Sequence, residues 1–104
     1  MEASEITPEM LTDAKDKLYI SWDENDEQVR RIILRACKYV QSKVSQELTF
    51  APDSDEYELM LERCRYDWNN ALDEFETNYS SEILAFIQSY ALKDWRDKHA
   101  ESAN

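Results

Sequence analysis

The residue types that carry nucleophilic catalysis occur in this sequence only in isolation. His99 is the sole histidine of the 104 residues, and it lies in a polar C-terminal stretch. A Ser-His-Asp or Cys-His arrangement would have to use this one residue as its base. Cys37 and Cys64 are too far apart for a Cys-x-x-Cys metal or redox motif. We therefore predict no catalytic residues, and we interpret His99 as a solvated surface residue and the cysteines as buried free thiols.

Two acidic stretches resemble calcium-binding loops only in part. In the stretch that begins at Asp23, Gln28 stands where the loop needs a glycine and Leu34 where the bidentate glutamate belongs. The stretch that begins at Asp53 has Cys64 at its twelfth position. A di-iron helical bundle needs paired Glu-x-x-His motifs, and the sequence has none. We therefore expect no metal and no cofactor, and interpret both stretches as helix caps.

Glycine is absent from the chain, and proline occurs only twice. This excludes the Gly-rich phosphate loops of P-loop and dinucleotide-binding proteins. It also removes most hairpin turns, which prefer Asn-Gly, Asp-Gly or Gly-Gly. A chain of 104 residues with 42% hydrophobic side chains can still bury one core. The composition therefore predicts a single all-α domain that is not an enzyme.

The chain is strongly acidic, with 23 acidic and 12 basic side chains and a net charge of -11. Residues 1–52 carry ten acidic and seven basic side chains, so their net charge is -3. Residues 53–104 carry thirteen and five, so their net charge is -8. Such a polyanion is repelled by nucleic-acid phosphates and by anionic membrane surfaces. With no apolar leader after Glu2 and Glu5, we expect a cytoplasmic chain with no membrane partner.

Four helices with short connections are predicted to form a small bundle. The first covers residues 8–17, with Thr7 as its N-cap and Pro8 at its first position. The second starts at a capping box formed by Asn25 and Gln28 and is the long central helix, about 20 residues in length. Its apolar residues recur at spacings of three and four: Val29, Ile32, Ile33, Ala36, Cys37, Val40 and Val44.

The second half of the chain is predicted to contain two further helices. A capping box of Asp53 and Glu56 starts the third helix, which ends near Asn78. The fourth begins at residue 80 or 81 and ends at Leu92, with an inward face formed by Ile83, Leu84, Ile87, Tyr90 and Ala91. Residues 1–92 are thus expected to form one helical domain, and residues 93–104 a polar, flexible tail.

Four apolar residues are candidates for a partner interface. Leu59 and Tyr66 lie seven residues apart on the side of the third helix that faces away from its main apolar stripe. Leu92 and Trp95 flank the fourth helix and the tail; Trp95 either anchors a partner or folds back over the end of the core. Trp22, before the central helix, is interpreted as a core residue.

Two charged faces are complementary. The central helix carries a basic back formed by Arg31, Arg35 and Lys38. The third helix carries acidic residues on its outer face, namely Glu58, Glu62, Asp73 and Glu76. Either both faces are solvated, or they meet between neighbouring copies of the chain. A contact between two different faces is heterologous, and its repetition around an axis closes a ring.

The order of these motifs resembles a known family. The segments that carry the likeness are Ile6-Thr7-Pro8, Leu18-x-Ile20, Asp23-Glu24-x-Asp26-Glu27 and Val29-x-x-Ile32-Ile33-x-x-Ala36-x-x-Tyr39-Val40. A helix with Tyr66 and Trp68, a polar interruption at residues 78–81 and an apolar run over residues 83–92 follow. Over residues 6–92 the chain is similar to the head-completion (head–tail connector, or adaptor) proteins of long-tailed double-stranded-DNA phages and prophages.

The resemblance implies a structural protein of virion assembly. It implies binding to the portal protein after DNA packaging, assembly of copies into a ring that extends the DNA channel, and a docking surface for a stopper or tail-completion protein. DNA would only pass through that channel, and the protein would move from the host cytoplasm to the head–tail interface of the virion. A small acidic DNA mimic that inhibits a nucleic-acid-binding protein is the alternative hypothesis.

Overall fold

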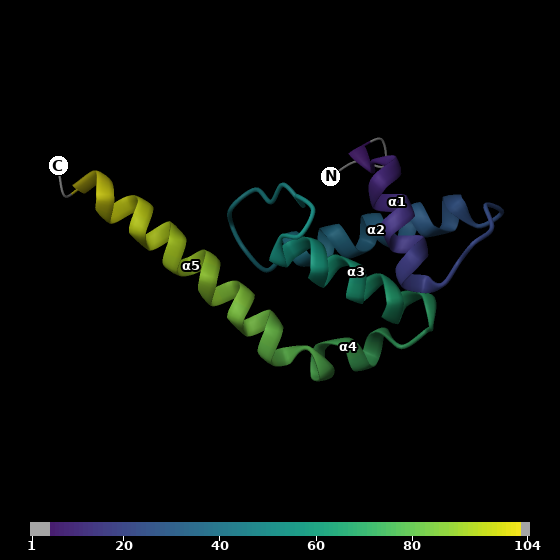
Figure 1. Ribbon diagram of the computed structural model, residues 1–104. Helices are drawn as coiled ribbons and strands as arrows, with labels where there is room; N and C mark the ends of the chain where they lie inside the picture. Colours follow the sequence, from purple (N-terminus) through teal and green to yellow (C-terminus); the bar gives the residue numbers. More distant parts are fainter. Residues whose placement is uncertain (1–4, 103–104) are drawn as a thin grey trace.

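Between residues 5 and 102, the part of the chain that it describes, the computed structural model of this protein is all-helical and contains no strand (Figure 1). The helices are α1 (Pro8–Leu18), α2 (Asp26–Gln41), α3 (Asp55–Trp68), α4 (Leu72–Asn78) and α5 (Ser80–Ser102). The all-α prediction is therefore confirmed, with five helices in place of about four. Glu2 and the last two residues of the predicted tail lie outside the described part.

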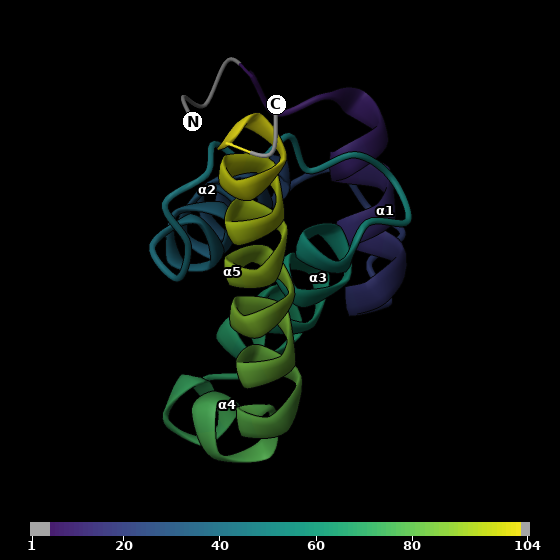
Figure 2. The same cartoon turned by 90° about the vertical axis from the view of Figure 1, so that its left-hand side faces the viewer.

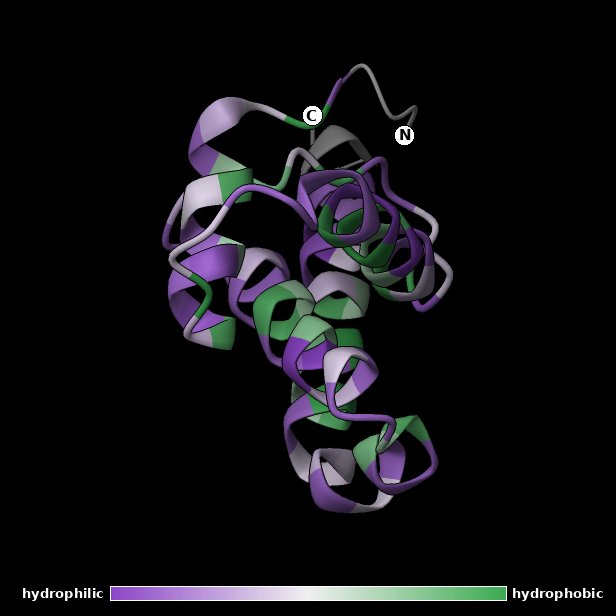
Figure 3. Ribbon diagram, turned by 90° about the vertical axis from the view of Figure 1, so that its right-hand side faces the viewer, coloured by the Kyte–Doolittle hydropathy of each residue, from purple (hydrophilic) through white to green (hydrophobic). Residues whose placement is uncertain are grey.

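Helices α1, α2 and α3 form the core. Each is amphipathic and turns its apolar side toward the other two, so that hydrophobic segments gather toward the middle of the molecule (Figure 3). Ala14, Val29, Ile33 and Met60 are fully buried where the three helices meet. Burial of one aliphatic side chain contributes about 1.5–3 kcal/mol, so this junction is the main source of stability.

The starts of α1 and α2 are capped in different ways. The Thr7 hydroxyl accepts a hydrogen bond of 3.1 Å from the backbone N–H of Met10, which confirms the predicted cap. Asn25 occupies the cap position of α2, but its side chain bonds to the side chain of Gln28 and not to the backbone. The predicted capping box of α2 is therefore only partly formed.

The cap of α3 differs from the prediction. The Ser54 hydroxyl, and not Asp53, accepts a hydrogen bond of 3.2 Å from the N–H of Tyr57. Asp53 lies one residue too early and has a φ of 67°, in the left-handed region. Glu56 does not reach back to the cap either, because it is buried and accepts a hydrogen bond from the Tyr90 hydroxyl.

Helix α2 ends at Gln41 after 16 residues, before the predicted end near Val44. The Gln41 side chain is the reason, because it holds the following loop. Its Nε2 donates to the carbonyl of Gln46 at 2.7 Å, and its Oε1 accepts from the N–H of Leu48 at 2.9 Å. Leu48 and Phe50 are buried, so the loop between α2 and α3 covers one end of the core.

The predicted third helix is two helices. Asn70 has a φ of 57°, a left-handed conformation that ends a helix and that asparagine tolerates better than most residues. The side chain of Asn69 donates to the carbonyl of Arg65 at 2.8 Å and satisfies one group at the end of α3. The chain therefore changes direction at residues 69–71 before α4 begins.

Helix α4 is anchored by aromatic packing. Phe75 is fully buried, and its ring centroid lies 5.0–5.8 Å from those of Tyr39, Tyr66 and Tyr79. Edge-to-face and offset pairs of this kind add about 0.5–1.5 kcal/mol each beyond burial. The cluster fixes the corner from which α5 departs.

Helix α5 extends further than predicted. It runs unbroken through residues 93–102, where an irregular tail was expected after Leu92. No glycine or proline interrupts it, and Asp94 and Lys98 form an ion pair one turn apart at 3.1 Å. The flexibility of residues 93–104 in solution stays a prediction.

Helices α4 and α5 form an arm that leaves the three-helix core (Figures 1 and 2). The molecule is accordingly elongated, with principal extents of 56 × 30 × 19 Å. The first half of α5 packs against α3 and the loop through Phe86, which is buried, and Tyr90, whose carbonyl accepts from Gln46 at 2.7 Å. The predicted inward positions of Leu84 and Ala91 are wrong, since both side chains are exposed.

Candidate functional site

The two cysteines of the core are shielded from solvent. Among residues 5–102, no three His, Cys, Asp or Glu side chains are grouped to hold a metal ion. Cys37 and Cys64 are free and buried, as expected. Burial raises the pKa of the Cys37 thiol to about 12 and raises the pKa of Cys64 further. Both thiols are therefore protonated and shielded at neutral pH.

No helix in the described part of the chain has the length and hydrophobicity that crossing a membrane requires.

The acidic stretch between α1 and α2 binds a side chain of its own chain. Lys15 Nζ lies 2.7 Å from Asp23 Oδ1 and 2.8 Å from Asp26 Oδ1. The hydrogen bonds from Lys15 lower the pKa of Asp23, and the same bonds raise the pKa of Lys15. Trp22, predicted to be a core residue, is instead 44% exposed, because its indole N–H donates to the Asn25 side chain at the surface.

Leu59 and Tyr66 do not form an exposed patch. Leu59 is buried because α5 covers the face of α3 that was expected to be open. Tyr66 is half-buried in the aromatic cluster, edge-on to Phe75 and Tyr79. Arg63 lies over the Tyr39 ring at 3.9 Å, which closes the cluster from the other side. The expectation that Leu59 and Tyr66 lie together on an open face is therefore wrong, and a partner contact at these residues stays a prediction.

Members of both charged faces are paired within the chain, in each case with a residue outside the other face. Arg35 of α2 binds Asp67 of α3 at 3.1 Å. Lys43, after α2, lies 3.4 Å from Glu76 of α4, and the Tyr39 hydroxyl donates to the same carboxylate at 2.6 Å. The two contacts of Glu76 hold α4 on the core.

Arg31 and Lys38, the other two members of the basic back, are exposed. They remain available to a partner.

Glu62 ties three elements together. Its carboxylate forms an ion pair with Lys17 of α1 and accepts hydrogen bonds from Arg65 Nη2 at 2.8 Å and from the Tyr79 hydroxyl at 2.7 Å. Burial raises the pKa of Glu62, and the bonds from Lys17, Tyr79 and Arg65 outweigh this effect, so that the pKa falls to about 2. Glu62 therefore serves to bind other residues of the same chain, and only a small part of its side chain is exposed.

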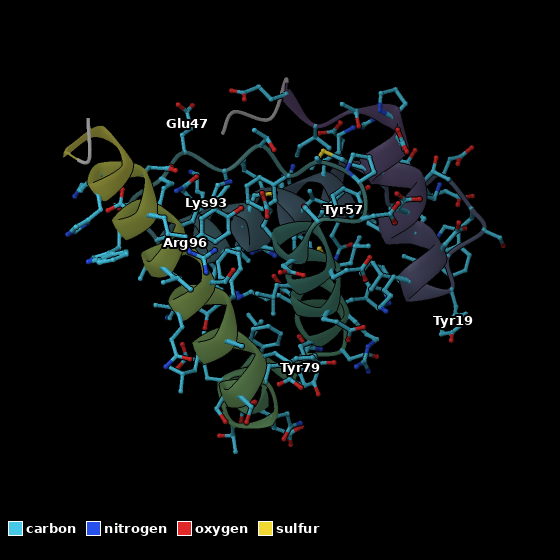
Figure 4. The ribbon with its side chains drawn as sticks, turned by 60° about the vertical axis from the view of Figure 1, so that its left-hand side comes forward. Tyr19, Glu47, Tyr57, Tyr79, Lys93 and Arg96 are labelled. Carbon is cyan, nitrogen blue, oxygen red and sulfur yellow. The ribbon has the colours of Figure 1, made fainter. Side chains whose placement is uncertain are left out.

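An acidic cleft lies between α1 and α3. It has a volume of about 860 Å³, and the carboxylates of Glu9, Asp13, Asp16, Asp53 and Glu58 line it. Tyr19, at the rim, is 89% exposed with a φ of 59°, and it projects away from the rest of the molecule (Figure 4).

Two polar contacts join the walls of the acidic cleft: the ion pair of Lys17 with Glu62, and a hydrogen bond from Tyr57. Tyr57 donates to Asp13 at 2.6 Å, and burial together with this bond raises the pKa of the Tyr57 hydroxyl. The bond joins the two walls and leaves the other carboxylates facing solvent.

A second groove lies between α3 and α5. It has a volume of about 310 Å³, with Leu59, Ala85 and Phe86 as its apolar lining. Glu58 and Asp55 of α3 stand on one side and Glu82 of α5 on the other. Within the described residues none of these three carboxylates forms an ion pair. The role of Phe86 and Glu82 was missed, although the three- and four-residue spacing from Tyr79 through Ile83, Phe86 and Tyr90 signals this face.

The distal half of α5 presents apolar side chains to solvent. Leu92 is 49% and Trp95 56% exposed, so of the two alternatives for Trp95 the one in which it folds back over the core is wrong. The rings of Trp95 and His99 stack at a centroid distance of 3.9 Å, which keeps the indole along the helix. Large exposed aromatic side chains of this kind are typical of interface anchors. Lys93 and Arg96 project from the same half of α5 (Figure 4).

Comparisons with protein-family models, with curated proteins and with solved structures find no match for this chain.

Proposed function

We propose that this protein is a structural component of virion assembly: a head–tail connector, or adaptor, that binds the phage portal after DNA packaging and forms a ring that extends the DNA channel. Its partners are the portal protein, a stopper or tail-completion protein, and further copies of itself. DNA is a passing occupant of the channel. The observation that carries the proposal is the α5 arm, an unbroken helix that leaves a small core and presents Leu92 and Trp95 to solvent.

The arm supports an assembly role because the second half of α5 does not take part in the core. Burial of the Phe86 and Tyr90 side of α5 needs only its first half. The second half adds an apolar surface that costs free energy until a partner covers it. A protein that joins other proteins benefits from such a helix.

The charge supports a role beside passing DNA. At a net charge of -11, the surface repels phosphates at moderate ionic strength. A ring of such chains would let DNA slide without binding it. This reading needs the carboxylates at the surface, and those of Glu58, Asp73 and Glu76 are exposed.

The test is capture of partners by the tagged chain from lysed cells in which phage particles are being assembled, followed by mass spectrometry. We expect the portal or a tail-completion protein to be recovered by the natural chain and to be depleted with Trp95→Ala. Leu84→Ala is the matched control, because Leu84 is equally exposed on α5 but lies nearer the core. Recovery of no virion protein, with both variants folded, contradicts the proposal.

The DNA-mimic alternative rests on a different surface. The acidic cleft between α1 and α3 gathers carboxylates that a nucleic-acid-binding protein could read as phosphates. Recovery of a nuclease or polymerase, lost at high salt and lost in Asp16→Asn with Glu58→Gln but unaffected by Trp95→Ala, would favour this function.

A further inference from the structure

The two ends of α5 carry complementary surfaces. The distal end holds an exposed apolar pair, Leu92 and Trp95. At 3.6 residues per turn, Arg96 falls beside Leu92 on one side of this pair and Lys98 beside Trp95 on the other. Asp94 and Asp97 fall on the opposite side of the helix. The result is an apolar ridge with a basic residue along each flank, of which Lys98 also forms an exposed ion pair with Asp94.

The base of α5 holds the matching groove. The apolar floor between α3 and α5 is flanked by Glu58 on one side and Glu82 on the other, and both carboxylates are exposed. Its volume of about 310 Å³ is at the lower end of the range of about 300–1,000 Å³ for ligand pockets, a size that suits one or two inserted side chains. The groove and the ridge are thus complementary. Both have an apolar centre, their flanks carry opposite charges, and the groove is large enough for the side chains of the ridge.

The ridge cannot reach the groove of its own chain. Both lie on one unbroken helix, and the ten residues from Glu82 to Leu92 place them about 15 Å apart along its axis. Only another molecule can bring the two surfaces together.

We propose that the distal end of α5 of one copy seats in the α3/α5 groove of a second copy, with Trp95 over Phe86 and Leu59 and with Arg96 and Lys98 against the carboxylates of Glu58 and Glu82. The contact joins two different surfaces, so each copy keeps one free ridge and one free groove. It is therefore heterologous and propagates until a ring closes. This inference rests on the proposed function, for which it names the contact between neighbouring copies.

The experiment measures self-association of the full chain by sedimentation velocity at increasing concentration, with two charge-reversed variants. The groove variant carries Glu58→Lys and Glu82→Lys; the ridge variant carries Arg96→Glu and Lys98→Glu. All four residues are on the surface, and circular dichroism verifies that helix content is retained. We expect the natural chain to form oligomers and each variant alone to remain monomeric.

The mixture of the two variants is the decisive sample. The basic ridge of the groove variant fits the acidic groove of the ridge variant, and the acidic ridge of the ridge variant faces the basic groove of the groove variant. Contacts between unlike chains are therefore complementary in charge, while contacts between like chains are repelled. We expect the mixture to recover the oligomers that each variant alone has lost, with the two variants alternating. If the groove variant self-associates as the natural chain does, the copies pack α5 against α5 and the proposal is overturned. A natural chain that stays monomeric up to near-millimolar concentration overturns it as well.

Apolar substitutions measure the ridge directly. Trp95→Ala is expected to weaken self-association by about tenfold or more, as for a buried aromatic anchor. Leu84→Ala, with the same exposure outside the ridge, is expected to leave it unchanged. Equal effects of the two contradict the assignment.

The outcome is separable from that of the proposed function. Head-to-tail association without capture of a virion protein would support this contact between copies and contradict the connector function. Capture of the portal by a chain that never self-associates would support the connector function and contradict this contact between copies.

Discussion

The three-helix core and the α5 arm are built from similar residues but use them differently. In α2 one apolar side faces the core, and its residues Val29, Ile33 and Val40 are fully buried. In α5 apolar side chains point to two sides: Phe86 is buried, while Leu84 and Trp95 are more than half exposed. A helix with one apolar side is satisfied by its own domain. The comparison teaches that α5, with apolar residues on two sides, completes the domain with its buried side and, at its distal end, offers Leu92 and Trp95 to a partner.

The largest difference between the regions concerns cavity formation. Ile33→Ala empties a fully buried site in α2, and we expect a loss of about 3–4 kcal/mol in the free energy of unfolding. Leu84→Ala, on the open side of α5, should change it by less than about 0.5 kcal/mol. Urea unfolding followed by circular dichroism, at a concentration where the chain is monomeric, gives both values. Equal losses would mean that α5 is as deeply packed as α2.

The next prediction concerns the seam between the two regions. Phe86→Ala removes the main apolar contact of α5, yet we expect a loss of only about 2 kcal/mol, below the usual range for a buried phenylalanine. The cost is limited because α5 can detach while α1–α3 stay folded. Hydrogen exchange should show fast exchange in residues 80–102 and retained protection in α2. Uniform loss of protection would show that arm and core unfold as one unit.

A smaller effect comes from the ionic tie that joins α1, α3 and the start of α5. The pKa of Glu62 is about 2 in the folded protein, against an ordinary value of 4.5. Its ionised form therefore contributes stability above about pH 4.5, and this contribution is lost as the pH falls toward 2. After allowance for solvent screening we expect about 1–2 kcal/mol.

The matched variant for this prediction is Glu62→Gln. It keeps the shape of the side chain but cannot ionise, so its stability should fall less than that of the natural chain over the same pH range. Unfolding in urea at pH 6, 4 and 2.5 measures the difference. Parallel curves for the two proteins would place the pH dependence on other carboxylates.

Local signals in the sequence were sufficient for the start of α1 and for the buried side of α2. Thr7 and Pro8 start α1 as predicted, because a cap depends only on residues a few positions apart. The apolar spacing of α2 gives its buried side for the same reason. Leu59 was misassigned because α5, a distant segment, covers it, and no pattern within α3 carries that information.

The candidate site also combines features that nearby residues determine with features that depend on distant segments. Leu92 and Trp95 were recognised as candidates, since exposed apolar residues in a polar stretch are visible in the sequence. The groove was not, because Glu58 and Glu82 belong to helices whose relative position is set by the turn at Asn70 and by the aromatic cluster around Phe75. Tertiary packing decides such a site.

The turn at Asn70 gives the smallest expected effect and tests what aims the arm. Its φ of 57° lies in the left-handed region, where asparagine and glycine are tolerated and alanine is strained. Asn70→Ala should therefore cost about 1 kcal/mol, whereas Asn70→Gly should stay within about 0.5 kcal/mol of the natural chain. If α3 instead continued straight through this position, alanine would favour the helix and would be the more stable of the two variants. Thermal unfolding of both variants, with small-angle scattering to follow the direction of α5, distinguishes a bent arm from a straight one, and only the bent arm forms the α3/α5 groove.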